Sequence, residues 1–252
     1  MNTSQPQPGR PLGPAGFDAV YRGDVGMLNR DDRARAAGMV HDRAPWDIGE
    51  PQPVVREIEA RGQISSEVLD MGCGPGDNAM FLAGHGYRVL GLDAAPAAIE
   101  RASRRAAERH AAAHFAVADA TSLAGYSGRF ATVLDSALYH CLTEDERAAY
   151  LRAAHRACLP GARLHLICFS DALPDWFPGP YRISEARLRA ALAGDWRLRD
   201  LRPATYTTIM TRDLMERRAP TEMRDVLRAA GVRYDDSDRL LVPAWLATAE
   251  RH

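Results

Sequence analysis

The chain has 252 residues, of which 46% are hydrophobic, a formal net charge of -1 at pH 7, and 32 basic residues that are all arginine. Such a chain can bury a sizeable core as a single α/β domain, and its balanced charge, without basic runs interleaved with aromatics, argues against nucleic acid as a partner. The absence of lysine excludes Schiff-base chemistry on lysine and a lysine general base.

The amino-terminal segment is not expected to be a signal peptide. Residues 1–16 are rich in Pro, Gln and Gly, lack the basic and then apolar pattern of a signal peptide, and are expected to be a disordered tail. No apolar stretch approaches the roughly 18 residues that a membrane span needs. The four cysteines show no C-x-x-C spacing, which favours reduced thiols. We therefore predict a cytoplasmic protein with no membrane partner and no metal site.

Residues 17–62 are expected to form helices that fold over a ligand as a lid. An aromatic, proline-bounded loop at residues 44–51 precedes an amphipathic helix at residues 53–60. Tyr21 and Trp46 are placed to close the site, and their rings would favour a neighbouring cation by about 0.5 to 2 kcal/mol. The alternative is that both aromatics only pack the amino-terminal helices on the sheet.

The most informative segment is residues 68–77, Val-Leu-Asp-Met-Gly-Cys-Gly-Pro-Gly-Asp. An apolar run followed by closely spaced glycines is typical of a first strand and a cofactor loop, because glycine permits a sharp turn and close approach of a ligand to the backbone. Asp70 would repel the pyrophosphate of a dinucleotide but favours the ammonium and sulfonium groups of S-adenosylmethionine. The amides of the following helix can face that ligand's carboxylate. An NAD loop and a structural glycine turn remain alternatives.

Three later strands are each expected to end on an acid. Asp93 lies 23 residues after Asp70, where it can accept hydrogen bonds from both hydroxyls of a ribose, or alternatively cap the next helix. Asp119 is placed to accept from the amine of an adenine. Asp135 ends the fourth strand and leads into residues 137–142, where the chain would pass the transferable methyl group.

An aromatic loop is expected to border the substrate cleft. A capping box at Thr143–Glu146 starts a helix that Pro160–Gly161 should end, and a fifth strand follows. The next loop, residues 171–181, is stiffened by prolines and should lie beside the cleft. Its aromatic side chains can stack on a flat ring, or alternatively pack on the surface: Trp176, Phe177 and Tyr181.

The last third of the chain should complete the sheet with a hairpin. Strands are predicted near residues 196–201 and 240–248. Residues 211–238 form a helical insertion between them, which can cap the cleft or provide a dimer surface. We expect a monomer or a homodimer, with residues 17–252 forming one domain.

Four motifs together resemble the class I S-adenosylmethionine-dependent methyltransferases: Pro45–Gly49, Leu69–Asn78, Asp135–Leu142 and Cys168–Asp171. The chain is more narrowly similar to small bacterial enzymes related to thiopurine methyltransferases and to heterocyclic-toxin methyltransferases that act on hydroxyquinolines and quinones. The likeness covers about residues 17–202. It implies a Rossmann-like α/β fold, with a mostly parallel seven-stranded sheet, an antiparallel carboxyl-terminal hairpin strand and helices on both faces.

The resemblance, with the patterns above, gives a set of expected site residues. The cofactor-binding residues are Tyr21, Trp46, Asp70, Gly72, Cys73, Gly74, Asp93, Ala94, Asp119, Ala120 and Asp135. The substrate-binding residues are His41, Tyr139, His140, Trp176, Phe177 and Tyr181, and the catalytic residues are His140 and Asp135.

The expected reaction is in-line SN2 transfer of a methyl group from S-adenosylmethionine to a heteroatom of a small aromatic or heterocyclic molecule. Positioning alone can supply much of the rate if the reacting atoms lie about 3 to 3.5 Å apart. If the acceptor is a weak acid, His140 is placed to take its proton, with His41 as a weaker second candidate, although a histidine near a helix start can also be structural. Methylation of another small metabolite, including at carbon, and a non-catalytic binding protein remain alternatives.

Overall fold

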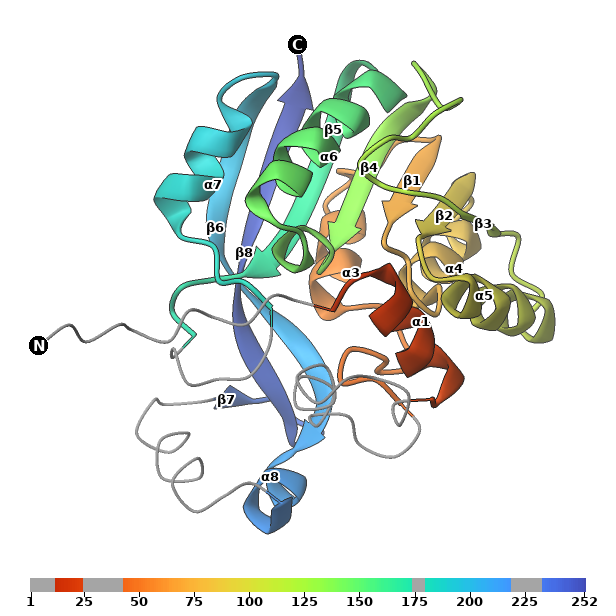
Figure 1. Ribbon diagram of the computed structural model, residues 1–252, viewed down its shortest axis with the longest axis vertical. Coiled ribbons are helices and arrows are strands. Elements are labelled where there is room, and N and C mark those ends of the chain that lie inside the picture. Colours follow the sequence, from red (N-terminus) through yellow and green to blue (C-terminus); the bar gives the residue numbers. More distant parts are fainter. Residues whose placement is uncertain (1–11, 25–42, 174–179, 219–232) are drawn as a thin grey trace, which may run out of the picture.

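A central sheet of eight strands organises the molecule (Figure 1). The computed structural model describes residues 12–24, 43–173, 180–218 and 233–252. The strand order is β3-β2-β1-β4-β5-β8-β6, and β7 pairs with β8. The strands are β1 (Val68–Met71), β2 (Val89–Asp93), β3 (His114–Val117), β4 (Phe130–Ser136), β5 (Cys158–Phe169), β6 (Trp196–Thr211), β7 (Arg233–Tyr234) and β8 (Arg239–Arg251).

The fold class is confirmed, but the expected count of seven strands is wrong. Strands β1 to β5 are mutually parallel, whereas β8 inserts between β5 and β6 and is antiparallel to both. The eighth strand is the two-residue β7, which pairs with β8 through Arg233 and Tyr234. Two residues are too few to show the alternation of apolar and polar side chains that predicts a strand. The strand is therefore seen only through its pairing with β8.

The strand register brings the acids of the first, second and fourth strands to one edge of the sheet. Asp135 lies opposite Met71, the residue after Asp70, and Asp93 lies opposite Val117 at the end of β3. In Figure 1 the arrowheads of β1 and β4 point to the same edge, near α1. Ligands of open α/β sheets bind at this carboxyl edge, so the site is expected there.

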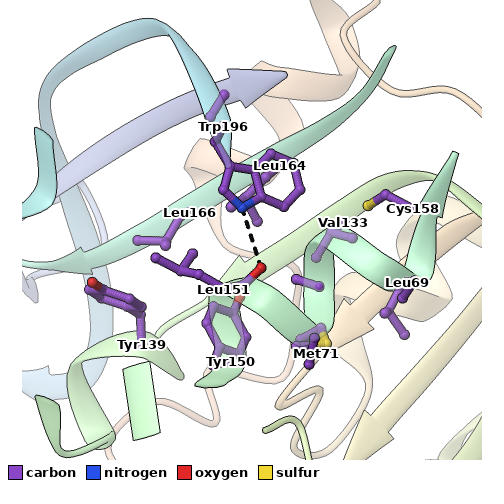
Figure 2. Close-up of a cluster of buried hydrophobic side chains, with 14 of the residues drawn as sticks. Leu69, Met71, Val133, Tyr139, Tyr150, Leu151, Cys158, Leu164, Leu166 and Trp196 are labelled. Carbon is purple, nitrogen blue, oxygen red and sulfur yellow. Dashed lines mark hydrogen bonds between the residues drawn. The ribbon is translucent and has the colours of Figure 1, made fainter. Parts of the chain in front are cut away.

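Helices cover both faces of the sheet. One apolar cluster joins α3 and α4 to the sheet, and another joins α6 and α7 to the opposite face. Figure 2 shows the second cluster, in which the Trp196 indole donates a hydrogen bond to the carbonyl of Leu151 (3.4 Å). The helices are α1 (Pro14–Arg22), α3 (Pro53–Ala60), α4 (Asp77–Gly84), α5 (Pro96–Glu108), α6 (Glu144–Ala157), α7 (Glu185–Leu192), α8 (Arg212–Arg218) and the 3-10 turn η2 (Tyr139–Cys141).

Several element boundaries differ from the sequence-based expectations. Helix α1 starts at Pro14, inside the expected tail, because proline at the first helical position needs no amide partner. The capping box at Thr143 is present, but Pro160–Gly161 lies inside β5 rather than ending α6. Strands β6 and β8 are longer than expected and extend past the carboxyl edge, where α8 and β7 lie (Figure 1).

The expected insertion at 211–238 contains α8 and β7, while the second helix expected there, near 221–230, lies outside the described residues. None of the helices in the described part of the chain combines the length and apolar character needed to cross a membrane.

Candidate cofactor and acceptor site

The glycine loop follows β1 in a backbone conformation that glycine favours. Gly72 and Gly74 have φ angles of 66° and 50°. A Cβ atom on Gly72 would lie 2.9 Å from Cβ of Leu138, and one on Gly74 would lie 2.8 Å from the Tyr21 hydroxyl. Both glycines are therefore required by the close approach of other side chains as well as by the turn itself. Cys73 is buried between them.

Asp70 lies at the end of β1 as a buried and unsatisfied acid. Its side chain is 1% exposed, and neither carboxylate oxygen has a hydrogen-bond partner within the described residues. Burial, together with the negative charges of Asp135 and Asp93, raises the pKa of Asp70 to about 7, and the nearby backbone amide of Ala79 only partly opposes this shift. An unpaired buried carboxylate is costly, so a cationic group of a ligand would satisfy it.

Asp93 joins the end of β2 to the glycine loop. One carboxylate oxygen accepts the amide of Gly74 (3.0 Å), and the other accepts the amide of Ala95 (2.9 Å). The cap of α5 is instead supplied by Asp18 of α1, which accepts the amide of Ala97 (2.8 Å). Burial raises the pKa of Asp93, while the amide hydrogen bonds oppose that shift. A carboxylate can accept further bonds beside these two.

The end of β3 contributes a short polar turn. The Asp119 carboxylate accepts the amide (2.8 Å) and the hydroxyl (2.7 Å) of Thr121. Asp119 is exposed, whereas Ala94 and Ala120 are half-buried. These residues therefore form a wall that solvent, or a ligand, can reach beside Asp93.

One aromatic side chain, Tyr21, lies over the glycine loop, and Trp46 packs against it. The Trp46 indole donates a hydrogen bond to the Tyr21 hydroxyl (2.8 Å), and their ring centroids are 6.3 Å apart. Tyr21 also packs on Ala95, Ala97 and Ala98 around α5, as the packing alternative requires. Because the same tyrosine lies over Gly74, packing and closure of the site are compatible roles.

Asp135 shapes the turn that follows β4. Its carboxylate accepts the amides of Leu138 (2.8 Å) and Tyr139 (3.1 Å). Burial raises the pKa of Asp135 to about 7, against the opposing effects of the Tyr150 hydroxyl and of these two amides. The intervening Ala137 has a φ angle of 85°, which costs energy for a residue with a side chain. The turn directs the following residues back over the sheet edge.

His140 is held as a neutral ring. Its Nδ1 accepts the amide of Phe169 (2.9 Å), and the two rings are stacked with centroids 4.0 Å apart. Burial, aided by the positive charge of Arg147, lowers the pKa of His140 to about 3. Since Nδ1 is an acceptor, the ring proton is on Nε2. This geometry favours a hydrogen-bond donor over a base, and the catalytic role expected of His140 stays a prediction.

Arg147 is a candidate site residue that the sequence reasoning missed. Its Nε donates to the carbonyl of Tyr139 (3.1 Å), and its guanidinium lies over the rings of Tyr139 (5.4 Å) and Tyr181 (4.8 Å). It is buried, and its Nη2 has no partner within the described part of the chain. The capping box predicts the helix start, but no local signal shows that this arginine turns inward.

The other expected substrate residues differ in their placement. Tyr139 packs inside the apolar cluster of Figure 2, 6.0 Å from the Tyr150 ring. The amide of Tyr181 donates to the carbonyl of His140 (3.0 Å), which keeps the half-buried Tyr181 near the 3-10 turn. His41, Trp176 and Phe177 lie outside the described residues.

Comparison with known proteins supplies the family. Residues 68–161 match a methyltransferase domain family. Over 180 residues the chain is 38% identical to 2-heptyl-1-hydroxyquinolin-4(1H)-one methyltransferase of Mycobacteroides abscessus, which covers 71% of this chain and 79% of that protein. The chain belongs to the class I S-adenosylmethionine-dependent methyltransferases.

This methyltransferase also resembles solved structures over most of its length. One, from work on the conversion of a disulfide bond into a thioacetal group during echinomycin biosynthesis, is 35% identical with a TM-score of 0.73 and covers 94% of this chain and 92% of that one. A methyltransferase from Methanosarcina mazei, 17% identical with a TM-score of 0.57, covers 80% of this chain and 98% of that one and shares the fold.

Proposed function

We propose that this methyltransferase transfers the methyl group of S-adenosylmethionine to a heteroatom of a small molecule with a flat aromatic or heterocyclic ring. The observation that carries the cofactor part is the unsatisfied, buried Asp70 carboxylate beside the glycine loop. An ammonium group is a chemical match for that carboxylate. When bound, the cofactor supplies an electrophilic methyl group on a sulfonium.

The cofactor would be held by groups that follow the strand ends. Asp70 would pair with its ammonium group, and the first amides of α4 would face its carboxylate. Asp93 would accept from the ribose hydroxyls and Asp119 from the adenine amine. Tyr21 and Trp46 would exclude water above Gly74, where the Tyr21 hydroxyl already lies.

The acceptor side supports a flat ring. Phe169 at the end of β5 stacks on His140 and meets the Tyr206 ring edge-on, with centroids 5.9 Å apart. Stacked and edge-on aromatic pairs are favourable beyond their buried area, and an aromatic acceptor can extend this group of rings. The hydroxyquinolone methyltransferase related to this chain acts on such a ring.

The proposed reaction does not require a base from this protein. An acidic N-hydroxyl or phenol can lose its proton to water before it binds. The neutral His140 would then donate its Nε2 proton as a hydrogen bond to an oxygen of the acceptor, which orients the acceptor for in-line attack.

A second candidate is methylation of a disulfide sulfur. The structure from the echinomycin work is 35% identical to this chain and covers 94% of it. A disulfide sulfur carries no proton and attacks the methyl group with a lone pair to give a sulfonium, so the transfer itself needs no basic histidine. Conversion of that sulfonium into a neutral thioacetal would break the S–S bond and release a proton from the adjacent carbon, so a proton acceptor would be needed at that later step.

Two experiments test the proposal. Calorimetry of the purified chain should show binding of S-adenosylhomocysteine and none of NAD. Turnover with S-adenosylmethionine would then be compared between a 1-hydroxyquinolone and a disulfide-bridged intermediate of echinomycin biosynthesis. Failure to bind S-adenosylhomocysteine would reject the cofactor assignment, and transfer to the disulfide alone would replace the first acceptor by the second.

A further inference from the structure

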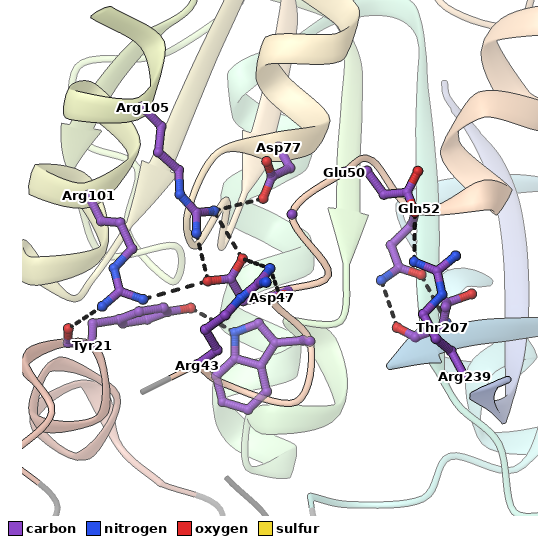
Figure 3. A network of polar contacts seen from close by, with 12 residues as sticks. Tyr21, Arg43, Asp47, Glu50, Gln52, Asp77, Arg101, Arg105, Thr207 and Arg239 are labelled. Carbon is purple, nitrogen blue, oxygen red and sulfur yellow. Dashed lines mark hydrogen bonds and ion pairs between the residues drawn. The ribbon is translucent and has the colours of Figure 1, made fainter. Parts of the chain in front are cut away.

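A buried ionic network surrounds Asp47, the residue that follows Trp46 in the chain (Figure 3). Asp47 is 1% exposed. Arg105 of α5 contacts both of its oxygens, Nη1 to Oδ1 at 3.0 Å and Nη2 to Oδ2 at 2.8 Å, and Arg101 lies 3.6 Å from Oδ2. Two-pronged contacts of this kind fix the orientation of both groups.

Each arginine of this network also contacts another wall of the cofactor site. Nη1 of Arg105 reaches Asp77 (2.9 Å), the first residue of α4 directly after the glycine loop. Nη2 of Arg101 donates to the carbonyl of Tyr21 (2.9 Å). The network therefore joins the loop that carries Trp46 to α1, α4 and α5.

The contacts form a closed ring, and one member of that ring, Tyr21, contacts the glycine loop. Asp47 binds Arg101, Arg101 binds Tyr21, Tyr21 accepts from Trp46, and Trp46 is the chain neighbour of Asp47. The Tyr21 hydroxyl lies close enough to Gly74 to exclude a Cβ atom there. Any displacement of Asp47 would thus move Trp46 and, through it, the Tyr21 side chain that lies over Gly74.

The same loop is anchored on its other side to the carboxyl-terminal hairpin. The side-chain amide of Gln52 exchanges two hydrogen bonds, both 3.0 Å, with the backbone of Thr207. The amide of Ile209 donates to the carbonyl of Pro45 (2.9 Å). Attachment at both sides indicates a fixed wall of the site rather than a freely swinging flap.

We infer that Asp47, Arg101 and Arg105 are positioning residues that hold Trp46 and Tyr21 against the glycine loop and so set the affinity for the adenosyl cofactor. Apolar packing can stabilise a loop as well as a buried ion pair does, but it does not fix direction in the same way. The inference rests on the proposed function, since it assumes that the loop binds this cofactor.

The test is Arg105→Gln, with Arg104→Gln as the matched control. Arg104 lies on the same helix, is 67% exposed and approaches only Glu108 (3.9 Å) among the described acids. We expect Arg105→Gln to raise the Kd for S-adenosylhomocysteine and the KM for S-adenosylmethionine about tenfold or more, with kcat at saturating cofactor within about twofold of wild type. Arg104→Gln should change neither. The chain has four tryptophans, so the fluorescence change on ligand binding is assigned to Trp46 by its loss in Trp46→Phe. That change should be smaller in Arg105→Gln and unaltered in Arg104→Gln.

Two further variants separate positioning from folding. Arg105→Lys keeps the positive charge but cannot contact both oxygens of Asp47 at once. It should therefore recover the thermal stability that Arg105→Gln loses, while its affinity for the cofactor stays below that of wild type. If Arg105→Gln does not fold, Asp47→Asn combined with Arg105→Gln removes both charges and is measured in its place. Wild-type affinity in a folded variant, or a loss of kcat with KM unchanged, overturns the inference. Failure of the wild-type chain to bind S-adenosylhomocysteine would instead reject the proposed function.

Discussion

The two sides of the carboxyl edge use different chemistry. On the proposed cofactor side, β1 supplies the buried and unpaired Asp70, while β2, α4 and α5 supply half-buried acids and arginines that are held by specific contacts. On the proposed acceptor side, η2 and β5 supply the neutral His140 stacked on Phe169, with the buried Arg147 of α6 beside Tyr139 and Tyr181. The charged cofactor side suits a charged ligand that is the same in every reaction. The acceptor side suits a flat molecule recognised mainly by stacking, so acceptor choice can change without altering the cofactor site.

The largest expected effect comes from Asp70→Asn, which tests the charged side. Without its negative charge the residue cannot pair with an ammonium group, and the affinity for S-adenosylhomocysteine should fall by about a hundredfold or more. The same variant should stabilise the ligand-free protein, because the pKa of Asp70 is raised from 3.8 to about 7 in the folded state.

The sign of that stability effect depends on pH. A carboxyl group whose pKa is raised by folding does not lower the free energy of unfolding when the pH is below its pKa in the unfolded chain. Above that pH, the free energy of unfolding falls by about 1.4 kcal/mol per pH unit until the pH passes the pKa of the folded protein. The gain in Tm of Asp70→Asn should therefore be small near pH 4 and full above about pH 7. The exposed Asp236→Asn is the control. A variant that binds the ligand normally would remove Asp70 from the cofactor site.

His140→Ala tests the neutral side and should leave the charged side intact. It removes the acceptor for the Phe169 amide and the stacked ring, so turnover should fall about tenfold while affinity for S-adenosylhomocysteine stays within about twofold. His140→Gln keeps a donor and an acceptor and should recover part of the loss. Steady-state kinetics with calorimetry measure both. Unchanged turnover in His140→Ala would separate this residue from the reaction.

A smaller effect is expected from Arg147→Met, which keeps the length of the side chain but removes its charge. Replacing a buried charge that lacks an acidic partner by an apolar group is often neutral or stabilising, so Tm should not fall. The KM for the acceptor should rise several-fold if Nη2 meets an oxygen of the acceptor, with cofactor KM unchanged. Equal changes in both KM values would mean that Arg147 acts on the whole edge rather than on the acceptor side.

Local signals in the sequence predicted local backbone geometry better than contacts between residues far apart in the chain. The glycine loop, the acids at strand ends and the capping box at Thr143 are short patterns, and each defines a local backbone geometry. The partner of Asp47 is Arg105, 58 residues later, and the partner of His140 is Phe169, 29 residues later. Such contacts depend on how helices and strands pack, so the sequence immediately around each residue does not predict them. The same holds for β7, whose pairing with β8 is its only signal.

The smallest expected effect is an absence of pH dependence, and it bears directly on the neutral side. The folded pKa of His140 is lowered to about 3, so the ring is neutral across the range in which an ordinary histidine titrates. Because the pKa of His140 is lower in the folded protein than in the unfolded chain, this residue does not reduce folding stability above the unfolded pKa, near 6.5. As the pH falls below about 6.5, the unfolded chain binds a proton there first and the folded protein loses stability. The pH profiles of kcat for wild type and His140→Gln should accordingly have the same shape between about pH 6 and pH 8, with no inflection that is present only in wild type. If wild type shows such an inflection and the variant lacks it, then His140 titrates in the complex and acts as a base. The neutral description of the acceptor side would then be wrong.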